Sequence, residues 1–372
     1  MSAPTPPVKR FEDSGGRVKK DESRRGFLYF TPQKRRPSLY EEVTVDTQPS
    51  PHRHMRGGWL LSFEDGRGTH SLGSTALRAK DWFDWRDPAG LWERPFYQQA
   101  AQAAREQDAA VASARSEGLF ARMGEDWRTF LQSSLQLPAF YEHGLWRALC
   151  GASRPALSDG ITHAIVLEAA TKQRQAQDLV VYAMDLEPEI GECSTEAAKQ
   201  RFLEEDAWQP VRALVERVYA VHDWAERVLA ANLCIEPLVG NFLRREMLLV
   251  PASANGDPVT PVIIGNAQRE WLWVRDWTTE LVRFCVEDEE FGEHNREVLT
   301  RWTQAWNAEA EAAAEAVAGE LDRVPRARPA GEALAQLRRE RDEVQSALQR
   351  KEAGTIPANA GAPGNRERMV GA

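Results

Sequence analysis

The most constraining feature of this 372-residue sequence is a series of long stretches in which apolar residues recur every three or four positions. In the clearest stretch, residues 159–187, the stripe consists of Ile161, Ile165, Glu168, Lys172, Gln175, Leu179 and Tyr182. Alternating steps of four and three place these side chains on one face of an α-helix. Ser158 or Asp159 can cap its start, and Pro188 is expected to stop it. The sequence therefore predicts an all-α bundle of long helices.

Further helices are predicted from spacing and from turn residues. They cover about 96–116, 126–135, 139–150, 208–232 and 233–250, and continue through 271–277 and 291–321. Pro237 should kink or restart the helix at 233–250. We expect a helical domain over 58–322, a C-terminal helix within 323–353 and a disordered tail at 354–372. The C-terminal seam of Leu334, Leu337, Val344 and Leu348, interrupted by Arg341, spans about two heptads.

Residues 1–57 are predicted to form an extended, largely irregular N-terminal arm. Repeated prolines and charge runs discourage both a helix and a core there. Residues 1–40 carry ten Lys/Arg against four acids, a balance of +6, whereas the whole chain has a net charge of −9. Two apolar patches, 27–30 (FLYF) and the β-like 43–45 (VTV), anchor the arm either to another protein or to its own body. Both interpretations stay open from the residues alone.

The middle of the 159–187 stripe is polar, and such a position in a helical bundle can hold a metal. Helical bundles bind two metals with one Glu on each of two helices and a Glu-x-x-His on each of two others. None of the seven histidines has Glu or Asp three positions before it. His ligands would stand three positions after Glu168 and Glu236, but these positions hold Thr171 and Val239. Lys172 comes four positions after Glu168 and has the spacing to form an ion pair with it. The chain is therefore predicted to hold no catalytic, cofactor or metal site of its own and to support a catalytic partner.

Two other functions are compatible with parts of the sequence. A metal oxidase with the atypical ligands Glu168, His222 and Glu236 is one rival, although a hydrogen-bonded core histidine is the favoured interpretation for His222 and for His163. The other rival is a nucleic-acid-binding protein that uses the basic arm. No nucleic-acid-binding motif accompanies that arm, so an acidic protein partner is favoured. Phosphate-binding glycine loops and nucleophile elbows are also absent from the sequence.

The compartment is expected to be cytoplasmic. No apolar stretch approaches the roughly 18 residues of a membrane span, and the N-terminus lacks an apolar signal region. The four cysteines are far apart in sequence and are interpreted as reduced core residues. The 13 Trp residues include the groups 271/273/277 and 302/306 at helical spacing, which favours packing in a core or a subunit interface.

Several stretches resemble the small (β) subunit of the hydroxylase of soluble di-iron multicomponent monooxygenases, most of all the propane monooxygenase type. They are 29–36 (YFTPQKRR), 40–49 (YEEVTVDTQP), 56–59 (RGGW), 81–88 (DWFDWRDP), 167–170 (LEAA), 175–179 (QAQDL) and 236–240 (EPLVG). The order of these segments matches over about residues 26–320. Toluene and phenol enzymes of the same family are more distant alternatives.

The resemblance implies a ferritin-like (ribonucleotide-reductase-like) helical bundle that pairs with a homologous large (α) subunit. The di-iron centre that activates O2 would belong to the large subunit, and this chain would carry no cofactor. Two copies of each subunit, with a third small subunit, would form the hydroxylase. A separate reductase would supply electrons from NADH, and a coupling protein would regulate the cycle. The reaction would be hydroxylation of a small hydrocarbon, such as propane to 2-propanol.

Two expectations concern the partner surface. Phe27, Tyr29 and Phe30 are predicted to anchor the arm on the large subunit, with Arg35 and Arg36 on acidic patches. The surroundings of Trp82, Trp85 and Trp92 are expected to be an aromatic surface that is left exposed when the chain is alone.

Overall fold

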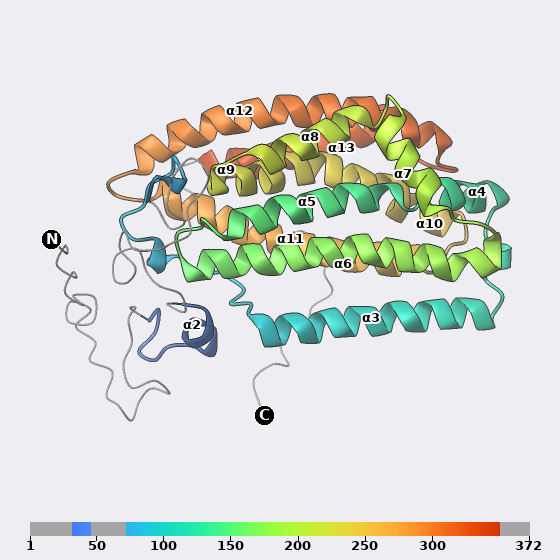
Figure 1. Cartoon of the computed structure of the whole chain (residues 1–372), viewed down its shortest axis with the longest axis horizontal. Helices are drawn as coiled ribbons and strands as arrows, with labels where there is room; N and C mark the ends of the chain where they lie inside the picture. The colour runs from blue at the N-terminus through green and yellow to red at the C-terminus, as the bar shows by residue number, and fades with distance from the viewer. Residues whose placement is uncertain (1–31, 46–71, 350–372) are drawn as a thin grey trace.

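The computed structural model describes residues 32–45 and 72–349 of the chain. This part of the molecule contains helices and no strand, and most of the long helices run along one direction (Figure 1). The predicted all-α, ferritin-like bundle is confirmed. Its longer helices are α3 (Glu93–Ser116), α4 (Glu125–Ser134), α5 (Leu137–Ser153), α6 (Asp159–Ile190), α7 (Thr195–Glu204), α8 (Gln209–Ala220), α11 (Thr260–Val286), α12 (Gly292–Val317) and α13 (Ala330–Gln349).

Shorter helical pieces complete the chain. They are α2 (Leu39–Thr44), α9 (Trp224–Leu229), α10 (Val250–Ala254), the π-helical segments η4 (Ala230–Gly240) and η5 (Phe242–Leu249), and the 3-10 turns η1 (Leu72–Ser74), η2 (Trp82–Asp84), η3 (Phe120–Arg122) and η6 (Ala318–Arg323). None of the helices in the described ranges combines the length and apolar character needed to cross a membrane.

Helix α6 is the longest helix in the described ranges and lies between α5 and α3 in the view of Figure 1. The Ser158 hydroxyl accepts a hydrogen bond from the Ile161 amide (3.3 Å), as predicted for an N-cap. The expectation that Pro188 stops this helix is wrong, because α6 continues to Ile190. A proline in the last turn removes one backbone hydrogen bond, whereas Gly191, with φ of 96°, leaves the helical conformation and ends it.

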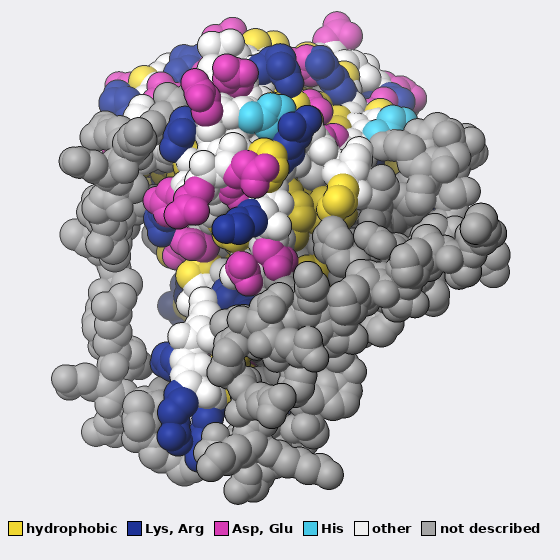
Figure 2. Space-filling view, turned by 90° about the vertical axis from the view of Figure 1, so that its left-hand side faces the viewer, with side chains coloured by type: hydrophobic (Ala, Val, Ile, Leu, Met, Phe, Trp, Pro, Cys, Tyr) yellow, Lys and Arg dark blue, Asp and Glu magenta, His cyan; other side chains and the backbone are white. Residues whose placement is uncertain are grey.

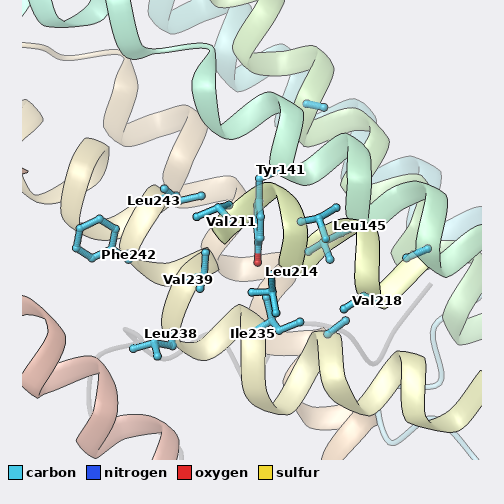
Figure 3. Close-up of a cluster of buried hydrophobic side chains, with 14 of the residues drawn as sticks. Tyr141, Leu145, Val211, Leu214, Val218, Ile235, Leu238, Val239, Phe242 and Leu243 are labelled. Atoms are coloured by element: carbon cyan, nitrogen blue, oxygen red, sulfur yellow. The ribbon is translucent and has the colours of Figure 1, made fainter. Parts of the chain in front are cut away.

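Helices α5 and α8 approach each other closely at a glycine. A Cβ atom on Gly144 of α5 would lie 2.1 Å from Cγ1 of Val215 in α8. Aliphatic side chains of α8 and of the π-helical segments fill the neighbouring core, around the ring of Tyr141 (Figure 3). This core is continuous along the bundle, so that α5, α6, α8, α11 and α12 share one apolar interior.

The region 208–250 differs from the prediction of two regular α-helices. Helix α8 ends at Ala220, and α9 begins at Trp224 after the Asp223 side chain caps it. Pro237, which was expected to kink or restart the helix, does not restart it, because it lies inside the π-helical segment η4. In an α-helix the carbonyl of Leu233 would need an amide from residue 237, and it instead accepts a hydrogen bond from Gln345 of α13 (2.6 Å).

The C-terminal helix α13 packs on the π-helical segments rather than extending away from the bundle. Leu334 and Leu337 of the predicted seam are buried. Arg341, which interrupts the seam, is also buried and pairs with Glu311 of α12 (2.8 Å). Residues 350–372, including the predicted disordered tail, lie outside the described residues.

Part of the predicted arm is fixed to the bundle through α2. Ser38 and Glu41 form a capping box at its start, and the Tyr40 hydroxyl accepts a hydrogen bond from the Asp87 amide (3.0 Å). Arg86 pairs with Glu41 at 3.3 Å with both side chains buried. The β-like character expected for 43–45 is wrong, since residues 43 and 44 belong to this helix. Thr44 and Val45 are buried against the chain's own body, which confirms the second interpretation of that patch.

The aromatic surface expected around Trp82, Trp85 and Trp92 is not present. Trp82 and Trp85 are buried, and their rings pack edge-on against Trp224 and Trp277, respectively. Trp92 is half-buried. These side chains therefore stabilise the chain's own core, as do Trp271, Trp302 and Trp306.

The close approach of α5 and α8 generates a prediction. We expect Gly144→Ala to lower the thermal midpoint, since overpacking a tight contact costs about 1–3 kcal/mol. The matched control is Gly265→Ala in α11, where nothing lies within 4 Å of the added Cβ. That control should leave stability unchanged or raise it by about 0.5–1 kcal/mol. Equal thermal midpoints for the two variants would contradict the close contact between Gly144 and Val215.

Candidate functional site

The polar centre of the bundle is a cluster of buried charges contributed by four segments, α5, α6, η4 and η5. Glu142 comes from α5, Lys172 from α6, and Glu236 from η4. The Lys172 ammonium lies between the two carboxylates, with Nζ 2.8 Å from Glu142 Oε2 and 2.7 Å from Glu236 Oε2. These three side chains are at most 3% exposed. A buried charge is stable only when it is paired, so this bridge ties three segments together.

Arg244 of η5 supplies the second cation. Its Nη2 lies 2.7 Å from Glu236 Oε2, and its Nη1 donates to Glu142 Oε1. The backbone leaves little room here, because a Cβ on Gly240 would lie 2.5 Å from Glu236 Oε1 and 2.9 Å from the guanidinium. Glycine at position 240 therefore allows Glu236 and Arg244 to meet.

Tyr141 completes the environment of Glu236. Its hydroxyl donates a hydrogen bond to Glu236 Oε1 (2.6 Å), while its ring lies among aliphatic side chains such as Leu145, Leu214 and Val239 (Figure 3). Each carboxylate in the cluster thus has more than one donor. That arrangement is what a buried anion needs in a low-dielectric interior.

Glu168 lies on the same helix as Lys172 but has different partners. Its Oε2 accepts a hydrogen bond from Asn232 Nδ2 (3.0 Å), and the same amide donates to the Thr278 hydroxyl. Its Oε1 is buried and has no hydrogen-bond partner. The predicted pair between Glu168 and Lys172 is wrong, since Lys172 reaches across the bundle to Glu142 and Glu236.

Charge states in the cluster follow from these contacts. Burial alone would raise the pKa of Glu236, but the charges of Arg244 and Lys172 outweigh it and lower the pKa to about 2. Burial disfavours the charged guanidinium of Arg244, yet Glu236 and Glu142 hold its pKa above the usual value. Burial raises the pKa of Glu168 to about 8, with Asn232 and Lys172 opposing the rise. Glu168 is therefore mainly protonated at neutral pH.

The arrangement does not offer a metal site or an acid–base pair open to a substrate. Within residues 32–45 and 72–349, no group of three or more His, Cys, Asp and Glu side chains is placed to hold a metal ion. Thr171 donates its hydroxyl to the Leu167 carbonyl (3.0 Å), and Val239 is buried in the apolar core. The cluster is a closed ion network that fastens helices to one another.

The structure separates the residues of the atypical ligand set. Glu168 and Glu236 are fully buried, whereas His222 is exposed in the connection between α8 and α9. The prediction of a core histidine at position 222 is therefore wrong, because the helix expected there ends at Ala220. His163 is half-buried, and its Nε2 lies 2.7 Å from Oε1 of Glu93 in α3. All four cysteines are free, and Cys150 is exposed rather than in the core.

Several members of the cluster were missed by the sequence analysis. Arg244 lies in a run of two arginines, and Glu142 precedes His143 at no spacing that indicates a shared site. No sequence pattern indicates a role in the cluster for Tyr141, Asn232 or Gly240. One available signal was the apolar character of 230–243, where a lone Glu236 requires a buried cation.

The predicted partner-interface residues are only partly described. Arg35 and Arg36 are exposed on the segment that precedes α2. Phe27, Tyr29 and Phe30 lie outside the described residues. Figure 2 looks at the end of the bundle where α2 lies, and the described surface there mixes acidic and basic side chains.

The raised pKa of Glu168 generates a prediction about pH. The folded state binds this proton more tightly than the unfolded state, whose carboxyl has the ordinary value near 4.5. The neutral Glu168 carboxyl therefore adds its full contribution to the free energy of unfolding below pH 4.5. This contribution is lost as the pH rises toward and through about 8. We expect Glu168→Gln, which mimics the neutral acid, to flatten the decline in unfolding free energy between pH 5 and 9.

Denaturant titrations at several pH values measure this effect, at about 1.4 kcal/mol per pKa unit. Glu187→Gln, at an exposed position of the same helix, is the control and should keep the original slope. A Glu168→Gln variant with the same pH profile as the unmodified chain would contradict a neutral Glu168.

Comparisons with known proteins agree with this architecture. Residues 59–289 match the model of the Methane/Phenol/Alkene Hydroxylase family. The chain is 32% identical over 303 residues to the small subunit of the hydroxylase component of propane 2-monooxygenase from Rhodococcus jostii (strain RHA1), covering 81% of this chain and 82% of that protein. It is 30% identical to the methane monooxygenase component A beta chain of Methylosinus trichosporium, covering 82% and 80%, respectively.

Solved structures show the same fold. A phenol hydroxylase chain from Pseudomonas sp. OX1 superposes with a TM-score of 0.74 at 18% identity, covering 89% of this chain and 94% of that chain. A chain of toluene 4-monooxygenase superposes with a TM-score of 0.67 at 20% identity, covering 77% and 94%, respectively. With more than half of its residues matched by the family model, the chain belongs to the methane/phenol/alkene hydroxylase family.

Proposed function

We propose that this chain is the non-catalytic small subunit of the hydroxylase component of a multicomponent monooxygenase. The observation that carries the proposal is the closed ion network, in which Lys172 and Arg244 lie between the carboxylates at the centre of the bundle. Chemistry that needs a metal and O2 then belongs to a large subunit with a di-iron centre. Relatives described as propane 2-monooxygenase small subunits favour hydroxylation of propane to 2-propanol.

The proposed assembly contains two copies of each subunit. A reductase delivers electrons from NADH, and a coupling protein acts on the same hydroxylase. The role of this chain is to hold the large subunit in its working conformation through an extended interface. Such interfaces commonly bury about 800 Å² on each partner or more.

One candidate for that interface is a stripe along α6. Between residues 166 and 184 the exposed residues of this helix are all uncharged: Val166, Gln173, Gln177, Val181 and Met184. Val181 and Met184 are 54% and 66% exposed, respectively. Exposed helix faces normally carry charges, so an uncharged stripe about 27 Å long fits a helix of the partner.

The arm provides a second candidate. Tyr40 and Glu41 hold α2 on the bundle through Asp87 and Arg86, so the preceding segment starts from a fixed point. We propose that Arg35 and Arg36 bind acidic groups of the large subunit, with Phe27, Tyr29 and Phe30 as apolar anchors. Ordering such a segment costs about 1–2 kcal/mol per residue, which buried aromatic area offsets.

The separate roles of the two subunits are tested by producing the chain with and without a large subunit of the same hydroxylase family. We expect iron and NADH-dependent 2-propanol formation only when the large subunit is present together with the reductase and coupling protein. Iron analysis and gas chromatography measure the two properties. About two tightly bound irons per copy of the isolated chain would overturn the proposal.

The interface is tested by introducing negative charges on the α6 stripe and by reversing charges on the arm. Val181→Glu with Met184→Glu, and separately Arg35→Glu with Arg36→Glu, should each weaken binding to the large subunit by about tenfold or more, or roughly 1.4 kcal/mol. Leu203→Glu, at an exposed apolar position of α7, is the control. Unchanged affinity for a pair, measured by calorimetry on chains with unchanged circular dichroism, would remove that surface from the interface.

A further inference from the structure

The centre of the bundle gathers three buried carboxylates from facing segments, but cationic side chains rather than a metal neutralise two of them. Glu142, Glu168 and Glu236 come from α5, α6 and η4, and each is at most 1% exposed. Burying carboxylates on facing helices is costly, and bundles that do so usually bind cations between them. Here the fit to a metal fails, because cationic side chains lie between the carboxylates.

The contacts of these side chains follow the pattern of bridging metals. Lys172 contacts one oxygen of Glu142 and one of Glu236, at 2.8 and 2.7 Å. Arg244 contacts the same two carboxylates. Glu142 and Glu236 are thus each shared by two cations, and each cation is shared by these two carboxylates. The ammonium of Lys172 and the guanidinium of Arg244 balance the two negative charges.

A second observation concerns an unpartnered oxygen near this network. Glu168 is completely buried, and its Oε1 has no hydrogen-bond partner. Glu168 lies one helical turn before Lys172 on α6, on the same face of that helix. An unpartnered buried oxygen is unusual and is available to a cation that replaces Lys172.

We infer that Lys172 and Arg244 occupy the places of two divalent cations in a carboxylate-lined core, and that Lys172 is the residue that excludes metal from this chain. Without the ammonium, one negative charge of Glu142 and Glu236 is left uncompensated beside Glu168. The donors are then oxygens alone, since Thr171 and Val239 supply no imidazole. Oxygen-only sites select hard divalent ions, of which Mn²⁺ is a spectroscopically visible example.

The experiment uses the full chain with Lys172→Ala. The variant should have a lower thermal midpoint than the unmodified chain in EDTA, and Mn²⁺ should restore part of the loss. Binding at a concentration 100 times the Kd would raise the folding equilibrium constant about 100-fold. Equilibrium dialysis and electron paramagnetic resonance should report about one Mn²⁺ per chain. The unmodified chain should show neither binding nor a shift.

Two further variants keep the outcome decisive. Lys172→Ala with Glu142→Gln restores charge balance and should lose the Mn²⁺ response. Lys172→Met keeps the length of the side chain and serves if the alanine variant does not fold in EDTA. A folded Lys172→Ala or Lys172→Met chain that takes up no Mn²⁺ would overturn the inference, as would failure of both to fold with and without Mn²⁺.

The inference does not depend on the proposed function. Metal uptake is measured on this chain alone, whereas the small-subunit role is measured by assembly and turnover with the large subunit. Either result can fail while the other stands.

Discussion

The buried ion network of Glu142, Lys172, Glu236 and Arg244 is the constraint on which the centre of the structure depends. Its members come from α5, α6 and the two π-helical segments, so none of these four segments can shift without unpairing a buried charge. Unpairing one partner of a buried pair costs about 3–5 kcal/mol, which is a large part of a typical domain's stability. The network therefore fixes the register of the bundle more tightly than apolar packing alone does.

The backbone around the network is adapted to it. Gly240 leaves room for Glu236 and Arg244 to approach, and a larger residue would enter the space of the ion pair. The π-helical winding of 230–249 accommodates Pro237 within a continuous segment, and Gln345 of α13 donates to the carbonyl of Leu233. This segment carries Glu236 and Arg244, whereas Lys172 reaches them from α6.

The surface of the bundle differs from its core in the side chains that it offers to a partner. The tryptophans that seemed available to a partner pack inside the chain, while α6 presents an uncharged stripe over most of its length. The segment around α2 is tied to the turn after Trp85 by Tyr40 and the pair of Glu41 with Arg86. The segment around α2 and the uncharged face of α6 fit the role of a supporting subunit. Each offers surface to a partner while the core of the bundle stays packed.

The sequence by itself determined the all-α class, most helix positions, and the lack of a Glu-x-x-His pair, because these depend on local spacing and on residue identity. It also placed Thr171 and Val239 at positions where ligands would stand. Only the tertiary structure decided that Lys172 bridges Glu142 and Glu236 rather than pairing with Glu168 one turn away. Helical spacing brings two side chains within reach, but the choice among acceptors depends on residues 30 and 64 positions away. The burial of Trp82 and Trp85 and the exposure of His222 were decided in the same way, by contacts between segments that no local pattern records.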